Sequence, residues 1–365
     1  MRKVLVAATG LCVAGLVTLV LAELLFRALP VMSSMGAQPV TAERPVFHFA
    51  PNSEFTYSRH WNMALARRGH INNAGFVNDR DYSADAPGPL MAVIGDSYVE
   101  AAMIPADETF HGRLAGELGD RGRIYSFGAS GAPLSQYLVW ADHVRRTYAP
   151  DAMAVLVIGN DFDESLLAYK SAPGFHYFAP DGDGTLRLTR VDYVPGRIGI
   201  VRSAFARYLL LNLQAYDTLN RVVARLRGEP GAMAFAGNVP VRVDDRRLAD
   251  SMKATDAFLR DLPEASGLPP ERLVLMVDGL HDIADAGPGY RETFFWRMRT
   301  YLAEQARRRG FEVVDLQPHL DARARATGRA MDLRPIDGHW SAEGHAVAAE
   351  ALRETAAYRR IFGPE

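Results

Sequence analysis

Short, continuous apolar runs alternate with segments of helical periodicity over most of this sequence. Five runs have the length and composition of buried strands, and they cover residues 90–94, 123–127, 153–158, 273–277 and 312–316. Segments whose apolar positions recur every three or four residues cover residues 106–118, 134–147, 290–309 and 341–358. Strands that alternate with helices predict a parallel sheet covered by helices on both faces, which places the chain in the α/β class.

The amino terminus has a different pattern, a long apolar stretch with basic residues before it. Arg2 and Lys3 precede residues 4–26, whose only charged side chain is Glu23. At about 1.5 Å per residue, a helix of this length exceeds the ~30 Å hydrocarbon core of a bilayer. The basic pair favours a cytoplasmic amino terminus and translocation of the rest, hence a single-pass protein of the inner membrane. A cleaved signal peptide is the alternative, although its apolar region would normally span only about 7–15 residues.

The remaining segments suggest how the chain is divided. Residues 1–30 are the predicted anchor, and residues 89–360 are the predicted α/β domain. Residues 31–88 contain several prolines and no sustained periodicity, so we expect a spacer followed by a segment that packs on the domain. The alternating pattern is interrupted at about residues 165–262, which we interpret as an insertion.

Two features of the insertion have structural interpretations. The Asp-Gly-Asp-Gly sequence at 181–184 predicts a hairpin turn, since a calcium loop would need glycine where Leu186 stands. Residues 201–226 predict a long, basic amphipathic helix. We favour a helix packed on the core with one solvated face; a lid over the site or a contact with anionic lipid headgroups is the alternative.

Composition and charge exclude several classes of protein. Apolar residues make up 48% and charged residues 23% of the chain, an ordinary globular composition. The formal net charge is −2, which gives no basic field for binding nucleic acid. Cys12 is the only cysteine and lies in the amino-terminal apolar stretch, so neither an intrachain disulfide nor a cysteine-based metal site can form.

The residues with candidate chemistry follow the predicted strands. These are Gly95-Asp96-Ser97 after the first strand, Gly128 after the second, Gly159-Asn160-Asp161 after the third, and Asp337-Gly338-His339 before the last helix. Ligands of open α/β sheets gather outside the carboxyl ends of the strands, where Ser97 would stand as a nucleophile. His339 can accept the serine proton, Asp337 can orient the imidazole, and the Asn160 amide can donate to an oxyanion. Taken alone, each motif also fits a helix cap, a turn residue or an exposed loop histidine.

Together, these motifs resemble those of the SGNH hydrolase (GDSL-type) superfamily, over about residues 89–355. The resemblance implies a three-layer α/β/α sandwich of the flavodoxin-like type, with Ser97, Asp337 and His339 as the catalytic residues. It also implies an oxyanion hole made by the backbone N–H groups of Ser97 and Gly128 and the side chain of Asn160. Gly95, Asp96, Gly159 and Asp161 are the supporting motif residues. The implied mechanism needs no metal and no organic cofactor.

The implied function is hydrolysis of ester bonds, O-acyl or O-acetyl, on a cell-envelope carbohydrate or lipid. Two departures from the family pattern bear on it: glycine directly precedes Asn160, and only Gly338 separates Asp337 from His339. This tighter Asp-x-His-Trp form is similar to SGNH-like domains of bacterial exopolysaccharide O-acetylation machinery, which makes a polysaccharide O-acetyltransferase an alternative. A non-catalytic carbohydrate-binding or assembly protein is an alternative of another class.

Three other histidines are alternative candidates for the base. His345 falls within the last predicted helix, His281 follows the fourth strand, and His319 follows the fifth. The resemblance favours His339, with His319 as the best substitute. The acyl group, the acceptor, the oligomeric state and any protein partner are left open by the sequence.

Overall fold

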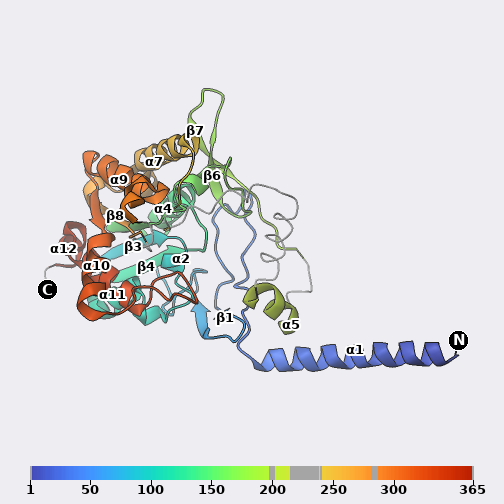
Figure 1. Cartoon of the computed structure of the whole chain (residues 1–365). Coiled ribbons are helices and arrows are strands. Elements are labelled where there is room, and N and C mark those ends of the chain that lie inside the picture. Colours follow the sequence, from blue (N-terminus) through green and yellow to red (C-terminus); the bar gives the residue numbers. More distant parts are fainter. Residues whose placement is uncertain (1, 197–201, 214–237, 239–240, 281–286, 364–365) are drawn as a thin grey trace.

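The computed structural model describes residues 2–196, 202–213, 238, 241–280 and 287–363 (Figure 1). Its centre is a sheet of five parallel strands in the order β4-β3-β5-β8-β9. The strands are β3 (Leu90–Gly95), β4 (Arg123–Gly128), β5 (Ala152–Val157), β8 (Leu273–Val277) and β9 (Glu312–Asp315). Counted along the chain, this order is second, first, third, fourth and fifth, which is the flavodoxin-like arrangement. The predicted α/β class is confirmed, and each predicted strand is present within one residue of its expected bounds.

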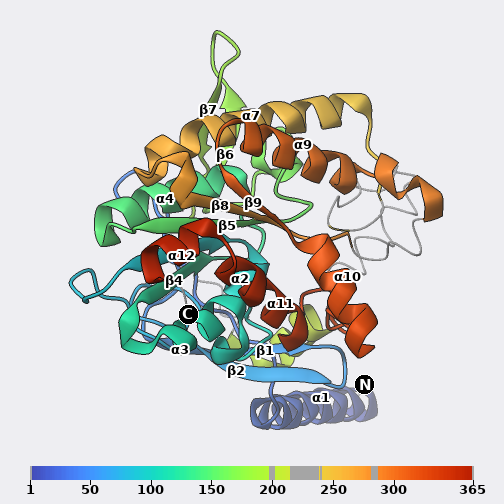
Figure 2. The same ribbon diagram turned by 90° about the vertical axis from the view of Figure 1, so that its left-hand side faces the viewer.

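Helices cover both faces of this sheet and make it the middle of three layers (Figure 2). One face carries α4 (Leu134–Tyr148), α7 (Asp245–Ser266) and α9 (Phe294–Arg308). The other carries α3 (Phe110–Leu118), α10 (Leu316–Thr327), α11 (Ala342–Arg353) and α12 (Ala356–Phe362).

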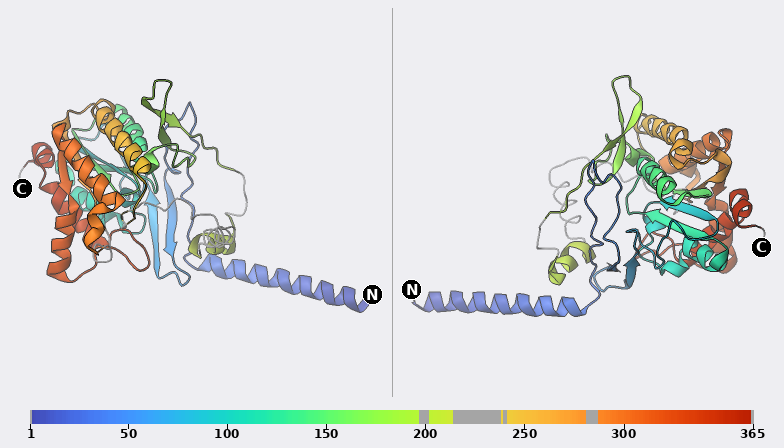
Figure 3. Two further views of the ribbon diagram at one scale, coloured as in Figure 1. Left: turned by 45° about the horizontal axis from the view of Figure 1, so that its top comes forward. Right: turned by 180° about the vertical axis from the view of Figure 1, so that it is seen from behind.

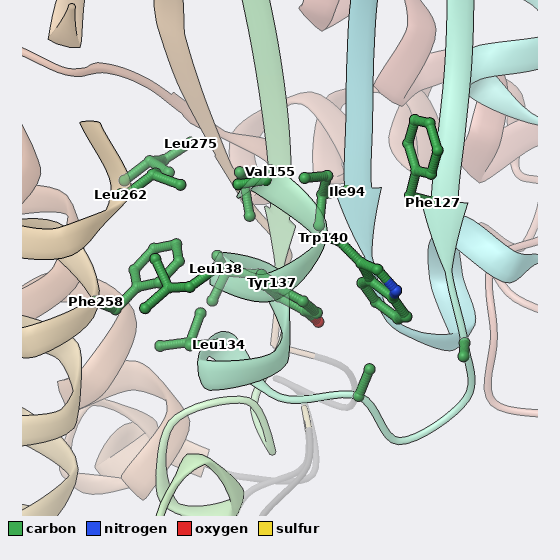
Figure 4. Packing of buried hydrophobic residues seen from close by; sticks show 14 of the residues in the cluster. Ile94, Phe127, Leu134, Tyr137, Leu138, Trp140, Val155, Phe258, Leu262 and Leu275 are labelled. Carbon is green, nitrogen blue, oxygen red and sulfur yellow. The ribbon is translucent and has the colours of Figure 1, made fainter. Parts of the chain in front are cut away.

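Successive strand residues point to opposite faces and so belong to two separate cores. On β3, Ile94 packs toward the layer of α4 and α7, whereas Val93 packs toward the layer of α3 and α11. Figure 4 shows Ile94 and Val155 from the sheet facing Leu138 and Phe258 from the helices. Because both faces are buried, the strands read as continuous apolar runs rather than alternating ones.

The predicted helices differ from the observed ones mainly at their ends. The helix expected at 106–118 is a 3₁₀ turn, η1 (Ala106–Glu108), followed by α3, which begins after Thr109 because that side chain caps it. The closing helix divides into α11 and α12, and η7 (Gly287–Glu292) precedes α9. Further 3₁₀ turns are η2 (Gly119–Arg121), η3 (Asp163–Ser165) and η6 (Pro270–Arg272).

Two of the longer helices in the described residues were not predicted. The helix α7 connects β5 to β8 and lies partly in the presumed insertion. Its many charged residues, and Pro263 in its last turn, make its apolar periodicity hard to recognise in the sequence. The helix α10 begins directly after β9, where Asp315 caps it. Leu316, which we expected to end the strand, is its first residue.

Two antiparallel hairpins pack outside the main sheet. In the hairpin β6 (His176–Pro180) and β7 (Leu186–Arg190), Asp181 accepts backbone hydrogen bonds across the turn, which confirms the predicted turn at 181–184. The hairpin β1 (Ser53–Arg59) and β2 (Leu65–Ile71) belongs to residues 31–88, which we expected to be a spacer followed by a segment that packs on the domain. Phe55 and Tyr57 of β1 are buried in the same apolar cluster as residues of α4 and α7, so this hairpin is part of the fold.

The amino-terminal helix α1 (Arg2–Ala28) extends away from the domain (Figures 1 and 3). By length and composition, it is the one helix in the described residues that could cross a membrane. Beside its last turns lie α5 (Ala204–Arg207) and the π-helical turn η5 (Tyr208–Asn212). These two belong to the helix predicted at 201–226, of which residues 201 and 214–226 lie outside the described residues. The described part contacts α1 and β1, which differs from the expected helix packed on the core.

Candidate active site

Ser97, His339 and Asp337 form one hydrogen-bonded series. The Nε2 atom of His339 lies 2.8 Å from Ser97 Oγ. The other ring nitrogen, Nδ1, contacts Asp337 Oδ1, which also accepts the backbone N–H of His339 at 2.9 Å. An ionised carboxylate only accepts hydrogen bonds, so Nδ1 carries the proton and Nε2 is left to accept from the serine.

The serine stands on a short, tightly held turn. Ser97 is the first residue of α2 (Ser97–Glu100), which follows directly on β3. Asp96 caps α2 by accepting the N–H of Tyr98 at 3.0 Å. Ser97 is 8% exposed and the His339 side chain 22%, so both reach solvent from an otherwise buried turn.

The serine hydroxyl has two acceptors for its one proton. Asp96 Oδ2 lies 3.0 Å from Ser97 Oγ, against 2.8 Å for His339 Nε2. Burial raises the pKa of the Asp96 carboxyl, although hydrogen bonds and the nearby His339 act in the opposite direction. Proton transfer to the imidazole requires the hydroxyl to turn from Asp96 to His339.

The loop that carries Asp337 and His339 is closed on itself. Leu333 donates its N–H to the carbonyl of His339 at 2.9 Å and accepts the N–H of Asp337 at 3.2 Å. Tyr98 donates to the carbonyl of Gly338 at 3.1 Å, and its ring packs against the imidazole with centroids 4.8 Å apart. The buried Trp340 donates to Asp278 at 3.0 Å and fixes the end of the loop. Tyr98, which directly follows Ser97, thus also positions the loop that carries His339.

Two residues that sequence reasoning missed hold the outer oxygen of Asp337. Tyr57 donates its hydroxyl to Asp337 Oδ2, and Arg59 Nε donates to the Tyr57 hydroxyl at 2.9 Å. The same Arg59 nitrogen lies 3.7 Å from Asp337 Oδ2. Both residues come from β1, more than 270 positions before Asp337. The only available signal was the alternation of polar and aromatic residues in 54–59, which is typical of a half-buried strand.

These contacts keep Asp337 ionised. Burial would raise the pKa of its carboxyl, but the hydrogen bonds from His339 and Tyr57 outweigh burial and lower it to about 2. Burial and the charge of Asp337 in turn raise the pKa of Tyr57, so the phenol stays a donor at neutral pH.

Gly95 and Gly128 allow α2 to pack on the ends of two strands. They are partners in the β3–β4 ladder. A Cβ at Gly128 would lie 2.7 Å from the backbone nitrogen of Glu100, and one at Gly95 would lie 2.5 Å from a methyl group of Val99. Real Cβ contacts are not this short, so glycine is needed at both positions. The oxyanion role of the Gly128 N–H stays a prediction.

Asn160 follows β5, the strand beside β3, and so lies at the same edge of the sheet as Ser97. Its Nδ2 donates to Glu164 Oε2 at 3.0 Å. Lys170 Nζ donates to the same carboxylate and, at 2.8 Å, to the carbonyl of Gly131. Because a carboxylate only accepts, Glu164 determines which way the amide points and engages one of the two N–H groups of Nδ2. We call Glu164 and Lys170 the clasp.

Gly131 was not singled out from the sequence. It lies in the loop after β4, with a φ of +77° that favours glycine. Among the hydrogen bonds of the described residues, none is donated by its backbone N–H. Its link to Asn160 through the clasp makes it a third candidate backbone donor beside Ser97 and Gly128. The Gly-Ala-Pro sequence at 131–133, a turn signal, was the available hint.

Asp161 and Gly159 serve the turn after β5. The fully buried Asp161 carboxyl accepts the N–H of Ile158 at 2.8 Å and the hydroxyl of Tyr137 at 3.0 Å. Gly159 donates its N–H to the side chain of Asn238. These contacts fix the chain on both sides of Asn160.

The other histidines differ from His339 in position. His345 is buried, and its Nδ1 accepts the N–H of Phe110 at 3.3 Å; burial holds the pKa of its imidazole well below the usual value. His319 is exposed on α10 rather than in a loop. His281 lies outside the described residues. His339 is the histidine whose ring bonds to Ser97.

The fold is a flavodoxin-like α/β sandwich, and its site has the geometry of a Ser-His-Asp triad at the carboxyl ends of the strands. Neither a protein-family model nor a curated protein sequence matches the chain.

Solved structures to which the chain is similar include three hydrolases. An α/β hydrolase enzyme from the metagenome of Lake Arreo, Spain, is 16% identical, with 75% of this chain and 98% of that chain covered and a TM-score of 0.39. A lipolytic G-D-S-L family protein from Veillonella parvula is 10% identical, with 74% and 98% covered and a TM-score of 0.38. An acetylxylan esterase from Geobacillus stearothermophilus is 13% identical, with 77% and 97% covered and a TM-score of 0.38. At these identities and TM-scores, the matches assign no residue roles to this chain.

Proposed function

We propose that the protein is a serine esterase of the SGNH type. The observation that carries the proposal is the hydrogen-bonded series from Ser97 Oγ through His339 to Asp337. A serine hydroxyl bonded to a neutral imidazole, whose other nitrogen donates to a buried carboxylate, is an activated nucleophile.

The proposed reaction has two stages. Ser97 Oγ attacks the carbonyl carbon of an ester while His339 Nε2 takes the serine proton. The tetrahedral intermediate collapses, the alcohol leaves with that proton, and an acyl group remains on Ser97. Water then attacks the acyl-serine with His339 as the base, which releases the acid and restores the hydroxyl.

The developing oxyanion needs donors at the same edge of the sheet. We assign this role to the Asn160 side chain together with backbone N–H groups of Ser97 and Gly128, and Gly131 is a further backbone candidate. An oxyanion donor of this kind contributes about 2.7–4 kcal/mol to transition-state stabilisation. The clasp supports the assignment of Asn160, because it orients the amide before substrate binds.

We further propose that α1 anchors the protein in the inner membrane, with its amino terminus in the cytoplasm and the site on the other side. The support is a helix long and apolar enough to span a bilayer, with Arg2 and Lys3 at its start. The substrate class that this location favours is an acylated carbohydrate or lipid of the cell envelope. Digestion of sealed, inverted inner-membrane vesicles with added protease tests the orientation. The domain should be protected, because in these vesicles it would face the lumen.

Hydrolysis of p-nitrophenyl acetate by the full-length protein in detergent tests the chemistry. Ser97→Ala and His339→Ala should each reduce turnover to the buffer rate. His319→Ala, which changes an exposed histidine, is the matched control and should retain wild-type turnover. A wild type without activity, or a Ser97→Ala variant with full activity, would contradict the serine mechanism.

A further inference from the structure

The short helical segment α5–η5 is bonded to the end of the apolar helix α1. Glu23 of α1 accepts hydrogen bonds from Ser203 Oγ at 2.7 Å and from the backbone N–H groups of Ala204 and Phe205 at 3.1 Å. The ring of Phe26 stacks on that of Tyr208 with centroids 4.3 Å apart. In Figures 1 and 3, α5 lies beside the end of α1 that is nearer the domain.

These contacts fix the depth at which α5–η5 lies relative to α1. Residues 4–22 of α1 are uncharged, and Glu23 and Arg27 are the first charged residues that follow. If α1 spans a bilayer, hydrocarbon therefore gives way to headgroups near Glu23. Since the start of α5 is bonded to Glu23, the segment lies at this same boundary.

Large apolar side chains are exposed at this depth. Leu209, Leu210 and Leu213 are 37%, 41% and 38% exposed. Trp61, in the turn between β1 and β2, is 64% exposed, and its carbonyl accepts the hydroxyl of Tyr208 at 2.8 Å. We call Trp61, Tyr208, Leu209, Leu210 and Leu213 the juxtamembrane patch.

We propose that the juxtamembrane patch inserts into the interface of the bilayer that α1 crosses. Tryptophan and tyrosine favour the headgroup level because each has an apolar body and a polar tip, and leucines on one side of a short helical segment suit the boundary of the acyl chains. The exposed Arg27 and Arg202 flank the patch and suit anionic headgroups. The inference rests on the proposed anchoring and does not depend on the esterase chemistry.

The continuity of the patch with α1 favours lipid as its occupant. A lipid surface must surround the end of a membrane-spanning helix, and the patch is bonded directly to that end. A protein partner or a second copy would have to displace this lipid to reach the leucines.

Insertion of the patch would hold the active site close to the membrane. Asn212, at the end of η5, donates to Ser58 Oγ at 2.8 Å. Ser58 lies in β1 between Tyr57 and Arg59, the two residues that hold Asp337. The strand that supports the triad is thus fastened to the membrane-facing segment, so the site would meet esters presented at or near the bilayer surface.

Site-specific fluorescence of the full-length protein in nanodiscs of phosphatidylethanolamine and phosphatidylglycerol tests the inference. A Cys12→Ala background carries Leu210→Cys, labelled with an environment-sensitive nitrobenzoxadiazole dye. The matched control is Leu188→Cys on β7, because Leu188 is also 41% exposed and the β6–β7 hairpin lies far from α1 (Figure 1). The native Cys12, labelled in the otherwise unchanged chain, reports on insertion of α1.

The dye at position 210 should emit at shorter wavelength and lose about half of its intensity when lipids with headgroup-proximal doxyl groups are included. The dye at position 188 should emit as in water and be unaffected. When quenching at Cys12 shows that α1 is inserted, either of two results at position 210 overturns the inference. One is a water-like emission, and the other is a blue-shifted emission that lipid quenchers do not change. If Cys12 is quenched neither by these lipids nor by lipids with doxyl groups deep in the acyl chains, the anchor fails and the inference fails with it, whereas ester turnover in the same samples reports separately on the chemistry.

Discussion

Tyr57 donates its phenolic hydrogen bond to Asp337, a residue 280 positions further along the chain. The triad carboxylate is thereby held on one oxygen by His339 and on the other by a hairpin that precedes the α/β domain. Among the hydrogen bonds of the described residues, those of the Tyr57 hydroxyl go to Asp337 and Arg59 and not to the serine or the imidazole, so we assign Tyr57 a positioning role.

Tyr57→Phe should lower kcat for p-nitrophenyl acetate by about tenfold with little change in KM. Loss of the donor concentrates negative charge on Asp337 and favours the imidazolium, so the acid limb of the kcat/KM profile should move to higher pH. Tyr301→Phe is the matched control, because Tyr301 donates to Asp256 at 2.7 Å away from the site. A lower melting temperature with unchanged kcat and pH profile would instead show a purely structural role.

Asp337→Asn should reduce kcat by about 10⁴-fold. An asparagine amide at this position can donate to His339 Nδ1, which places the ring proton on Nε2, where it faces Ser97 and cannot accept the serine proton. The measurement is single-turnover acylation, with the thermal melt recorded beside it to establish that the variant folds. Retention of more than a tenth of the wild-type rate would argue against Asp337 as the orienting group.

The clasp gives a prediction about the Asn160 amide. Lys170→Met removes the cation that joins Glu164 to Gly131, so kcat should fall about tenfold while the fold is retained. The double variant Lys170→Met/Glu164→Gln should lose less kcat, expressed as activation free energy, than the two single variants together, because the two residues act as a pair. Lys253→Met, which disrupts a pair with Asp250 whose lysine is 70% exposed, is the control and should leave kcat unchanged. Additive effects of the two clasp variants would contradict the pairing.

The buried carboxyl of Glu100 should make the free energy of unfolding depend on pH. Burial raises the pKa of its carboxyl from 4.5 to about 7, against the hydrogen bonds from Ser130. The unfolded chain therefore releases this proton at lower pH than the folded one, so the carboxyl costs stability as pH rises from about 4.5 to 7 and costs most above pH 7. The full cost is roughly 3 kcal/mol at about 1.4 kcal/mol per pKa unit.

Glu100→Gln removes this ionisation while an amide can still bond to Ser130. Its melting temperature relative to wild type should therefore rise between pH 5 and pH 8. Glu304→Gln, at a side chain 55% exposed, should show no such trend and serves as the control. A difference between Glu100→Gln and wild type that is constant over this range would mean that Glu100 does not titrate there.

The strands of the main sheet could be predicted because both of their faces are buried. Runs such as residues 90–94 and 273–277 contain no polar position, which leaves few other interpretations. The hairpin β1–β2 could not be recognised in the same way, since Leu65–Ile71 contains two arginines and a histidine and only part of it is buried. The helix α7 was missed because charged residues are interspersed among its core-facing residues along its whole length, which obscures the apolar periodicity.

Some residues of the site could likewise be predicted from local sequence, whereas others could not. Ser97 and Asn160 were predicted from motifs at strand ends, since topology brings those ends to one edge of the sheet. Asp337 and His339 were predicted from their motif before the last helix. The contacts of Tyr57 and Arg59 with Asp337 have no counterpart in local sequence, because nothing in residues 53–71 specifies which distant carboxylate they meet. Lys170 was equally hidden, as its partners depend on the course of the loop after β5.

The hairpin β1–β2 also determines how much of the chain the site requires. A fragment beginning at residue 89 would contain Ser97, Asp337 and His339, and every strand of the main sheet. It would nevertheless leave Asp337 without its tyrosine and arginine partners and open the core that Phe55 and Tyr57 fill. For truncation, domain transplantation or recombinant expression, the smallest unit that preserves the site begins before Ser53.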